Sequence, residues 1–406
     1  MKSRTILISG AGVAGPALAY WLREHGFAVT VVERAPEPRL GGQAIDIRGT
    51  ARTVIQRMGL LDAVRAHHTG VHGIAYVDSR GRHQARMTNA DFGDSGVIAD
   101  LEIVRGDLVR LLTEAAQDGV EYRYGDTITA LTERAHGVEV EFANAPAQTF
   151  DLVVGADGTG SRVRSLAFGP YREFVADRGY HTCYFPARLR QPLHGWELFY
   201  SLPAGNGFRG RNAVLYPVGE QGEARAMFAF AGPPLPHLPE NAEQRLALLR
   251  RVYAGAGWEV PDLLGRLDAG EDIYLARAGR VRIDSYSRGR TVLLGDSAFA
   301  GSFGLGTSTS LVGAYVLAGE LARAEGEHRR AFAEYERIMR PFVQAATTDP
   351  PGGVRGFLPP NRIEIGLRTL FIRAMPYLPG KERFTGGIAE AAETITLADY
   401  GLTVPR

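Results

Sequence analysis

Three glycines near the N-terminus have the spacing that phosphate recognition requires. They follow an apolar run at residues 5–8, typical of a buried strand, and precede a segment of helical periodicity at residues 14–25. The first glycine permits a tight turn, the second lets a pyrophosphate approach the backbone, and the third allows close packing of helix on strand. Free N–H groups and the helix dipole favour anions at this helix start. The residues expected to bind phosphate here are Gly10, Gly12, Val13, Ala14 and Gly15.

An acidic residue closes the second strand of this unit. Residues 28–32 form another apolar run, so the first 33 residues indicate a strand–helix–strand unit with parallel strands. Glu33 lies 18 residues past the third glycine, where a carboxylate accepts hydrogen bonds from ribose hydroxyls. The combination predicts dinucleotide binding; the simpler alternative is a glycine-rich turn between packed elements. The nucleotide could be NAD or FAD.

Two later motifs distinguish these cofactors. The sequence Gly-Ala-Asp-Gly-Thr-Gly-Ser-Arg-Val-Arg at residues 155–164 follows a predicted β-meander, and Leu-Gly-Asp-Ser at residues 294–297 follows another short apolar strand. With the first motif, they resemble the three motifs of the para-hydroxybenzoate hydroxylase family (group A) of FAD-dependent aromatic monooxygenases, close to its tetracycline-inactivating and polyketide-tailoring members. The resemblance extends in order over nearly the whole chain and implies FAD as the cofactor.

The resemblance also implies roles for residues in the first and third motifs. The glycine motif would hold the ADP part of FAD, with Glu33 on the adenosine ribose and Arg34 beside it. Asp296, which follows Gly295, would bond the ribityl hydroxyls.

Further residues are implied between these motifs. Asp157, followed by Gly158, would order the loops around the pyrophosphate, and Arg105 would reach FAD from the start of a helix. Arg39 and Asp46 resemble residues that contribute to NADPH and flavin contacts in tetracycline-inactivating relatives. For Arg39, Asp46 and Arg105 the alternative is a solvated charged side chain.

A glycine-rich segment precedes the helix expected near residues 308–324. Its N–H groups would face the flavin ring and stabilise the negative charge of the reduced form. Just before it, residues 299–303, from Phe299 to Phe303, depart from the family pattern: they contain no proline and are two residues shorter than in most relatives. We therefore expect a less fixed loop beside the flavin. The segment comprises Gly304, Leu305, Gly306 and Thr307.

The resemblance implies a reaction carried by the cofactor. An FAD-dependent monooxygenase would use NAD(P)H, with NADPH favoured, and O2 to hydroxylate an aromatic or polyketide-like molecule through a flavin C4a-hydroperoxide. No side chain is assigned as catalytic. The alternative is an FAD-binding tailoring enzyme that does not transfer oxygen, such as a redox-neutral cyclase or a dehydrogenase. The motifs leave open the substrate and the choice between antibiotic biosynthesis and resistance.

The elements that must position these residues form an α/β fold in three parts. We expect a Rossmann-like FAD-binding domain, with a parallel sheet and β-meander, from residues 1–72, 101–175 and 286–350. A substrate domain with an antiparallel or mixed sheet would comprise residues 73–100 and 176–285, followed by a C-terminal helical segment at residues 351–406. Substrate contacts, with core packing as the alternative for each aromatic, are expected from Phe185, Tyr200, Arg211, Tyr216, Phe228 and Phe230.

The composition and charge of the chain limit the kinds of partner that it can bind. The 406 residues include 45% hydrophobic and 22% charged residues and carry a net charge of +1, without the basic clusters of a nucleic-acid-binding protein. The single Cys183 excludes an internal disulfide, and the pair His67–His68 lacks a third ligand, so no metal site is expected. No apolar stretch is long enough to cross a bilayer. The sequence therefore predicts a cytoplasmic monomer or homodimer that acts on a small molecule.

Overall fold

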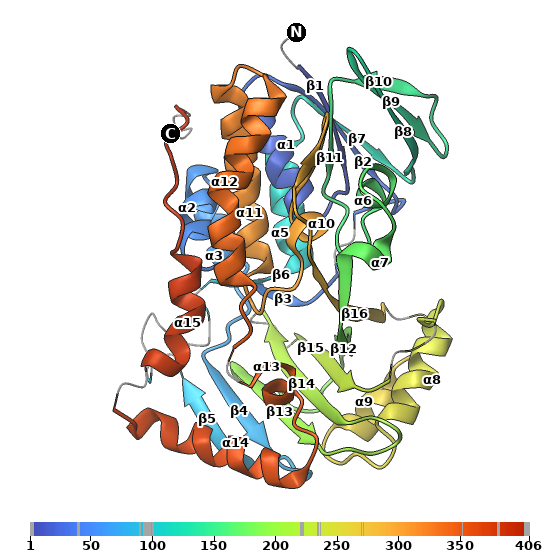
Figure 1. The fold of residues 1–406 in the computed structure, drawn as a ribbon. Helices are drawn as coiled ribbons and strands as arrows, with labels where there is room; N and C mark the ends of the chain where they lie inside the picture. The colour runs from blue at the N-terminus through green and yellow to red at the C-terminus, as the bar shows by residue number, and fades with distance from the viewer. Residues whose placement is uncertain are drawn as a thin grey trace.

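The computed structural model describes residues 4–38, 41–88, 91, 99, 101–219, 223–233, 235, 237–268, 270, 272–350, 352–379 and 382–401. Arg39 lies outside the described residues. Two large sheets dominate the described chain: one lies with long helices in the upper half of Figure 1, and the other lies below it. In the described chain, no helix combines the length and apolarity that a membrane span requires.

A six-stranded sheet is built on the N-terminal strand–helix–strand unit. Its order is β17–β18–β11–β1–β2–β7, and all neighbours run parallel except β17 and β18. Consecutive residues Ile6, Leu7 and Ile8 are all buried, so both faces of the sheet are covered. The strands are β1 (Thr5–Ser9), β2 (Ala28–Glu33), β7 (Val120–Tyr124), β11 (Leu152–Gly155), β17 (Ser287–Arg288) and β18 (Thr291–Leu293).

Helices and a small sheet surround these strands. The expected meander forms the antiparallel sheet β10–β9–β8, from β8 (Ile128–Arg134), β9 (Gly137–Phe142) and β10 (Gln148–Phe150). The helices are α1 (Ala14–Glu24), α2 (Thr50–Arg57), α3 (Leu61–Ala66), α5 (Arg105–Ala116), α6 (Arg162–Ala167), α7 (Tyr171–Phe174), α10 (Asp296–Phe299), α11 (Gly306–Arg323) and α12 (His328–Ala346).

A seven-stranded mixed sheet forms the other half, in the order β16–β12–β15–β14–β13–β4–β5. The hairpin of β4 and β5 joins it through a parallel pairing of β4 with β13, and the other neighbours are antiparallel. The strands are β4 (Gly73–Val77), β5 (His83–Thr88), β12 (Val175–Ala187), β13 (Trp196–Leu202), β14 (Gly210–Val218), β15 (Glu223–Ala231) and β16 (Tyr274–Val281).

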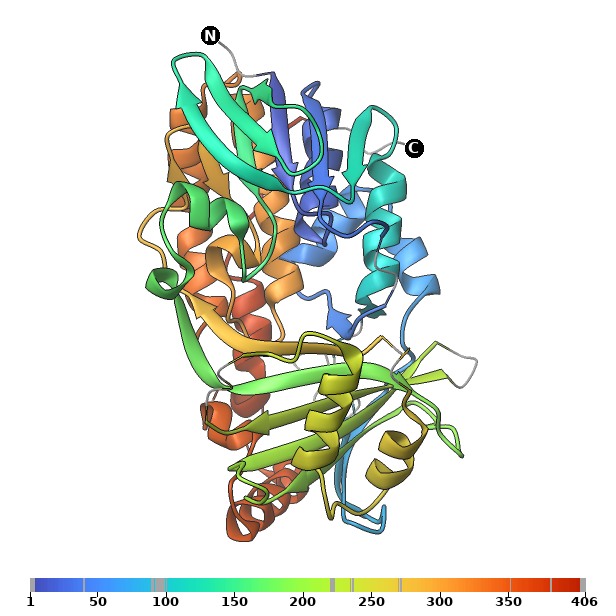
Figure 2. The ribbon, with the colours of Figure 1, turned by 90° about the vertical axis from the view of Figure 1, so that its right-hand side faces the viewer.

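The two faces of this sheet have different coverings. Helices α8 (Ala242–Val252) and α9 (Val260–Arg266) pack on one face, which is turned to the viewer in Figure 2. On the opposite face lie α13 (Gly353–Phe357) and α14 (Arg362–Ala374). A short 3-10 helix, η2 (Met375–Tyr377), and α15 (Glu382–Ala392) follow.

A small ribbon lies between the two halves in Figure 1: β3 (Ala44–Asp46) pairs antiparallel with β6 (Glu102–Val104). The sequence analysis did not predict this ribbon, nor β7 and β16, because these short or arginine-containing segments lack a strong period-two pattern. The six-stranded sheet takes strands from residues 5–33, 120–155 and 287–293, and the seven-stranded sheet takes them from residues 73–88 and 175–281. This distribution supports the expected discontinuous domain division, which we retain as a proposal.

Candidate functional site

The first glycine motif lies where β1, β2 and β11 end. The Gly10 N–H donates to the Val32 carbonyl at 2.7 Å. Gly10 has a φ of +106°, and a Cβ added to it would lie 2.6 Å from the Ala156 carbonyl oxygen. A Cβ on Gly15 would lie 1.9 Å from the Gly10 carbonyl oxygen, so α1 can begin this close to the turn only with glycine. The turn thus leaves its N–H groups at the start of α1.

Glu33 is held against this turn. Its carboxylate accepts from the Ala11 N–H at 2.9 Å and from the Ala35 N–H at 2.8 Å. These bonds fix the end of β2 beside the glycine turn, where a ribose would lie next to the phosphates. Arg34, the next residue, is exposed.

Arg105 connects the first motif with the third. It begins α5, and its Nη2 lies 3.1 Å from the position that a Cβ on Gly12 would occupy. Burial raises the pKa of Asp296, and the Arg105 guanidinium opposes that rise. Arg105 is thus close enough to both helix starts to act on the glycine turn and on the Asp296 carboxyl.

The Asp-Gly motif is also tied to the third motif. Asp157 accepts from the Arg162 N–H at 2.7 Å and from the Ser297 hydroxyl at 3.2 Å, and the Gly158 N–H donates to that hydroxyl at 3.1 Å. Arg164 is fully buried and donates to the Ser297 carbonyl at 2.8 Å. The sequence analysis gave Arg164 and Ser297 no role, although both lie within the quoted motifs.

Three helix N-termini meet at these motifs. Gly295 has a φ of +65°, and a Cβ on it would lie 3.0 Å from both the Ala14 Cβ on α1 and the Ser310 Oγ on α11. A Cβ on Gly306, at the start of α11, would lie 3.9 Å from Asp296 Oδ1. Glycine therefore allows α1, α10 and α11 to approach closely. The starts of α1 and α11, together with Arg105 at the start of α5, offer N–H groups and positive charge that suit an anion such as a diphosphate.

Asp46 lies at the end of β3, beside the glycine-rich segment that precedes α11. Its Oδ2 pairs with the Arg48 guanidinium at 2.9 Å and lies 3.7 Å from the position of a Cβ on Gly304. The Arg48 N–H donates to the Ser308 hydroxyl at 3.0 Å, so β3 is joined to the start of α11. Burial raises the pKa of Asp46, and Arg48 opposes this. Leu305 is buried and Thr307 half-buried at the same helix start.

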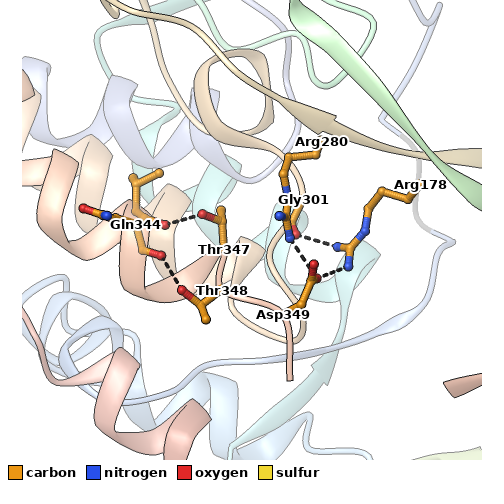
Figure 3. Close-up of polar contacts among 8 residues, drawn as sticks. Arg178, Arg280, Gly301, Gln344, Thr347, Thr348 and Asp349 are labelled. Carbon is orange, nitrogen blue, oxygen red and sulfur yellow. Dashed lines mark hydrogen bonds and ion pairs between the residues drawn. The ribbon is translucent and has the colours of Figure 1, made fainter. Parts of the chain in front are cut away.

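Side chains of two strands surround the proline-free loop (Figure 3). Arg178 of β12 donates to the Gly301 carbonyl at 2.7 Å and pairs with Asp349, which also binds Arg280 of β16 at 2.8 Å. The Val281 N–H donates to the Ala300 carbonyl at 2.9 Å. Contacts from β12 and β16 thus hold the loop at Ala300 and Gly301.

The two phenylalanines of this loop have different surroundings. Phe299 is buried in the core beneath the six-stranded sheet, with its ring 5.6 Å from that of Tyr286. Phe303 contacts Phe357 of α13, with ring centroids 5.7 Å apart. The loop thus joins the flavin-binding motifs to the C-terminal helices.

Five of the six substrate candidates lie on the face of the seven-stranded sheet that α8 and α9 cover. Their side chains point towards α8 and α9: the four aromatic residues belong to the core there, and Arg211 donates to the Val252 carbonyl at the end of α8 at 2.7 Å. Because successive strand residues alternate between faces, they point away from β3 and β6. We reassign these five residues to structural roles: Phe185, Tyr200, Arg211, Phe228 and Phe230.

The opposite face carries Tyr216, the sixth candidate, and residues that the sequence analysis missed. Glu197 opposes Tyr216, one position beyond the pair Leu198–Leu215, and Tyr216 in turn pairs with Arg225. Because side chains alternate between the two faces of a strand, the sequence could have shown which of these residues share a face. It could not indicate which group faces the glycine motifs.

Known proteins resemble this chain along most of its length. A model of the FAD binding domain family matches residues 3–349. An uncharacterized protein of Mycobacterium tuberculosis is 39% identical over 360 residues, 86% of this chain and 94% of that protein. An FAD-dependent monooxygenase of Sarocladium schorii is 30% identical over 432 aligned residues, covering 98% of this chain and 99% of the relative. Among solved structures, the tetracycline destructase Tet(51) has a TM-score of 0.80 at 28% identity and covers 98% of this chain and 100% of its own.

Proposed function

Because the chain belongs to the FAD binding domain family of flavin-dependent monooxygenases, we propose that it uses FAD, NAD(P)H and O2 to hydroxylate an aromatic or polyketide-like small molecule. One observation carries the proposal: Arg105, at the start of α5, lies beside Gly12 of the first motif and acts electrostatically on Asp296 of the third. The tetracycline destructase with 28% identity supports a multi-ring substrate.

We propose that FAD follows this path from Glu33 to Gly304. Glu33 would bind the adenosine ribose, and the N–H groups from Gly12 to Ala14 the diphosphate. Arg105 would neutralise phosphate charge, and the Asp296 carboxylate would accept from ribityl hydroxyls. When bound, FAD supplies the hydride acceptance and oxygen activation that the reaction needs.

The chain's own residues would bind, orient and exclude water. N–H groups at Gly306 and Thr307 would donate to the pyrimidine edge of the flavin, where negative charge develops. The hydrogen bond from Arg178 to Gly301 fixes the preceding loop, which we expect to shield the oxygen-reacting side.

The substrate ring would lie on the sheet face that carries Tyr216. Phe199, Val214 and Met227 are cross-strand neighbours there and form an apolar strip. At one end of this strip the Ser201 hydroxyl donates to Asn212 at 2.7 Å beneath α14. Glu197 and Tyr216 lie at the other end. An apolar strip with polar groups at both ends is typical of a site that orients a functionalised ring.

The test is to purify the protein, measure flavin released by denaturation, and follow NAD(P)H oxidation with a panel of phenols, naphthoquinones and tetracyclines. Product mass should increase by one oxygen atom, taken from labelled O2. A protein that neither contains nor binds FAD would refute the cofactor assignment. Conversion without oxygen gain would favour the redox-neutral alternative instead.

A further inference from the structure

Glu197 lies near the start of β13, on the sheet face that is turned towards β3 and β6. On β13 it pairs with Ile74 of β4 and opposes Tyr216 of β14. Its side chain is half-buried, so part of the surface remains accessible. Asp46 and Glu102, from the β3–β6 ribbon, both act on its charge. The carboxyl group therefore lies between the sheet and the end of the proposed FAD path.

Three acids lie together here, and an ion pair involves one of them. Burial, then Glu102 and Asp46, raise the pKa of Glu197 well above its ordinary value. Burial and Asp46 raise the pKa of Glu102 to about 7, although the Thr69 hydroxyl donates to it at 2.7 Å. Arg48 pairs with Asp46. Within the described residues, Glu197 itself has neither a hydrogen bond nor an ion pair.

The other charged or titratable groups near Glu197 act on different neighbours. Arg225 is the cross-strand partner of Tyr216. The guanidinium carbon of Arg368, on α14, lies 4.7 Å from the centroid of the Tyr76 ring. A buried carboxylate without a cation is costly, so burial favours the protonated form of Glu197 and an approaching positive group favours the ionised form. The groups that interact electrostatically with Glu197 are Asp46, Glu102, Tyr76 and Tyr216. Of the nearby cations, Arg48 acts on Asp46 and Glu102, Arg225 acts on Tyr216, and Arg368 acts on Tyr76.

A second, independent feature points to a ligand here. Tyr216 is only 4% exposed, and its hydroxyl has no hydrogen-bond partner among the described residues. Ala44 of β3 lies close to this hydroxyl without meeting hydrogen-bond geometry. A buried hydroxyl without a partner costs free energy unless a bound group satisfies it. Its position beside Glu197 brings a donor and an acidic acceptor to one point.

We propose that Glu197 and Tyr216 recognise a protonated amine carried by the substrate, with Glu102 adding negative charge behind them. The inference rests on the proposed function, because it assumes that the ring lies on the neighbouring apolar strip. The ammonium N–H groups would donate to the Glu197 carboxylate and to the Tyr216 oxygen. The ammonium and the Glu197 carboxylate carry opposite charges, which makes their hydrogen bond strong, while the Tyr216 hydroxyl is free to donate to the carboxylate.

The proposal predicts a particular pH dependence. Below the raised pKa of Glu197, an ammonium ligand must displace the carboxyl proton, and each lower pH unit should cost about tenfold in affinity. Affinity should therefore rise with pH until Glu197 is ionised, and then remain constant until the amine loses its own proton. Glu102→Gln removes a like charge and should shift this rise to lower pH. A neutral ligand with the same ring should show no such rise.

The experiment compares naphthylethylamine with naphthylethanol, which share a ring and differ in the charged group. Binding to the FAD-loaded protein is measured by calorimetry and by the change in the visible flavin spectrum, from about pH 6 to pH 8.5. At the alkaline end the amine should bind at least about tenfold more tightly than the alcohol. Glu197→Gln should abolish this preference and leave alcohol binding within about twofold. Glu141→Gln, an exposed change on β9, is the matched control.

Each outcome decides the proposal. Equal binding of the two ligands, failure of the amine to bind, or a preference that survives Glu197→Gln would overturn it. If Glu197→Gln does not fold, as judged by circular dichroism and FAD content, Tyr216→Phe and Glu102→Gln must weaken or shift the amine preference. Failure of the proposed function is separately visible. A protein that binds FAD and prefers the amine, yet transfers no oxygen, would refute the monooxygenase proposal alone.

Discussion

Replacing Glu102 by glutamine should stabilise the folded protein at neutral and alkaline pH but not in acid. Burial and the Asp46 carboxylate raise the Glu102 pKa from the ordinary 4.5 to about 7. The folded state thus keeps a proton that the unfolded chain releases, so this carboxyl costs stability increasingly as pH rises between these two pKa values. Their difference of about 2.5 pH units corresponds to ~3 kcal/mol. This is an upper limit because neighbouring acids titrate together.

Glutamine preserves the shape and the hydrogen bond of the site, because its carbonyl can still accept from the Thr69 hydroxyl. Urea unfolding of the parent, Glu102→Gln and the exposed control Glu141→Gln would be followed from about pH 5 to pH 8.5, with FAD in the same excess throughout. The free energies of unfolding of parent and Glu102→Gln should diverge as pH rises to about 7 and stay parallel above it. A difference that is constant over the whole range would refute the reasoning.

Three further changes test other parts of the site. Asp296→Ala should weaken FAD affinity roughly 10- to 150-fold in a fluorescence titration, because ribityl hydroxyls lose a charge-assisted partner; unchanged affinity would reject the assignment. Arg39→Ala should slow flavin reduction by NAD(P)H in stopped flow and leave the visible FAD spectrum intact, whereas equal kinetics would place Arg39 on the solvated surface. Asp349→Ala should release Arg178 from its ion pair and loosen the loop at Gly301, so more H2O2 should form per NAD(P)H oxidised at unchanged FAD affinity. An unchanged peroxide yield would show that the loop does not depend on Asp349.

Local chemistry made the cofactor motifs readable from sequence. A Cβ at Gly10 or Gly15 would collide with the backbone, so this tight strand-to-helix turn requires glycine at both positions. The residue types and their spacing therefore reveal the turn in the sequence. Asp157 satisfies N–H groups only a few residues ahead at Arg162, which is again a local requirement. For this reason the family, the strand–helix–strand unit, the meander and the mixed second sheet followed from the chain alone.

The sequence also indicated which strand residues share a face, since side chains alternate along each strand. It did not decide which face would meet the flavin-binding motifs. The answer depends on which face α8 and α9 cover. Phe185 and Phe228 lie in the core beneath these helices, whereas Tyr216 lies on the other face, near β3. The sequence analysis assigned all three to the substrate site because each strand was interpreted without its covering layer.

Only the tertiary structure assembled the acids Asp46, Glu102 and Glu197. They come from three segments far apart in the chain, and each is an ordinary surface residue type when considered singly. Their raised pKa values arise from burial and from one another, and neither cause exists before the β3–β6 ribbon docks near the seven-stranded sheet. Local backbone requirements can be recognised from residue types and their spacing. The electrostatics of a site depends instead on distances between residues that only the folded structure brings together.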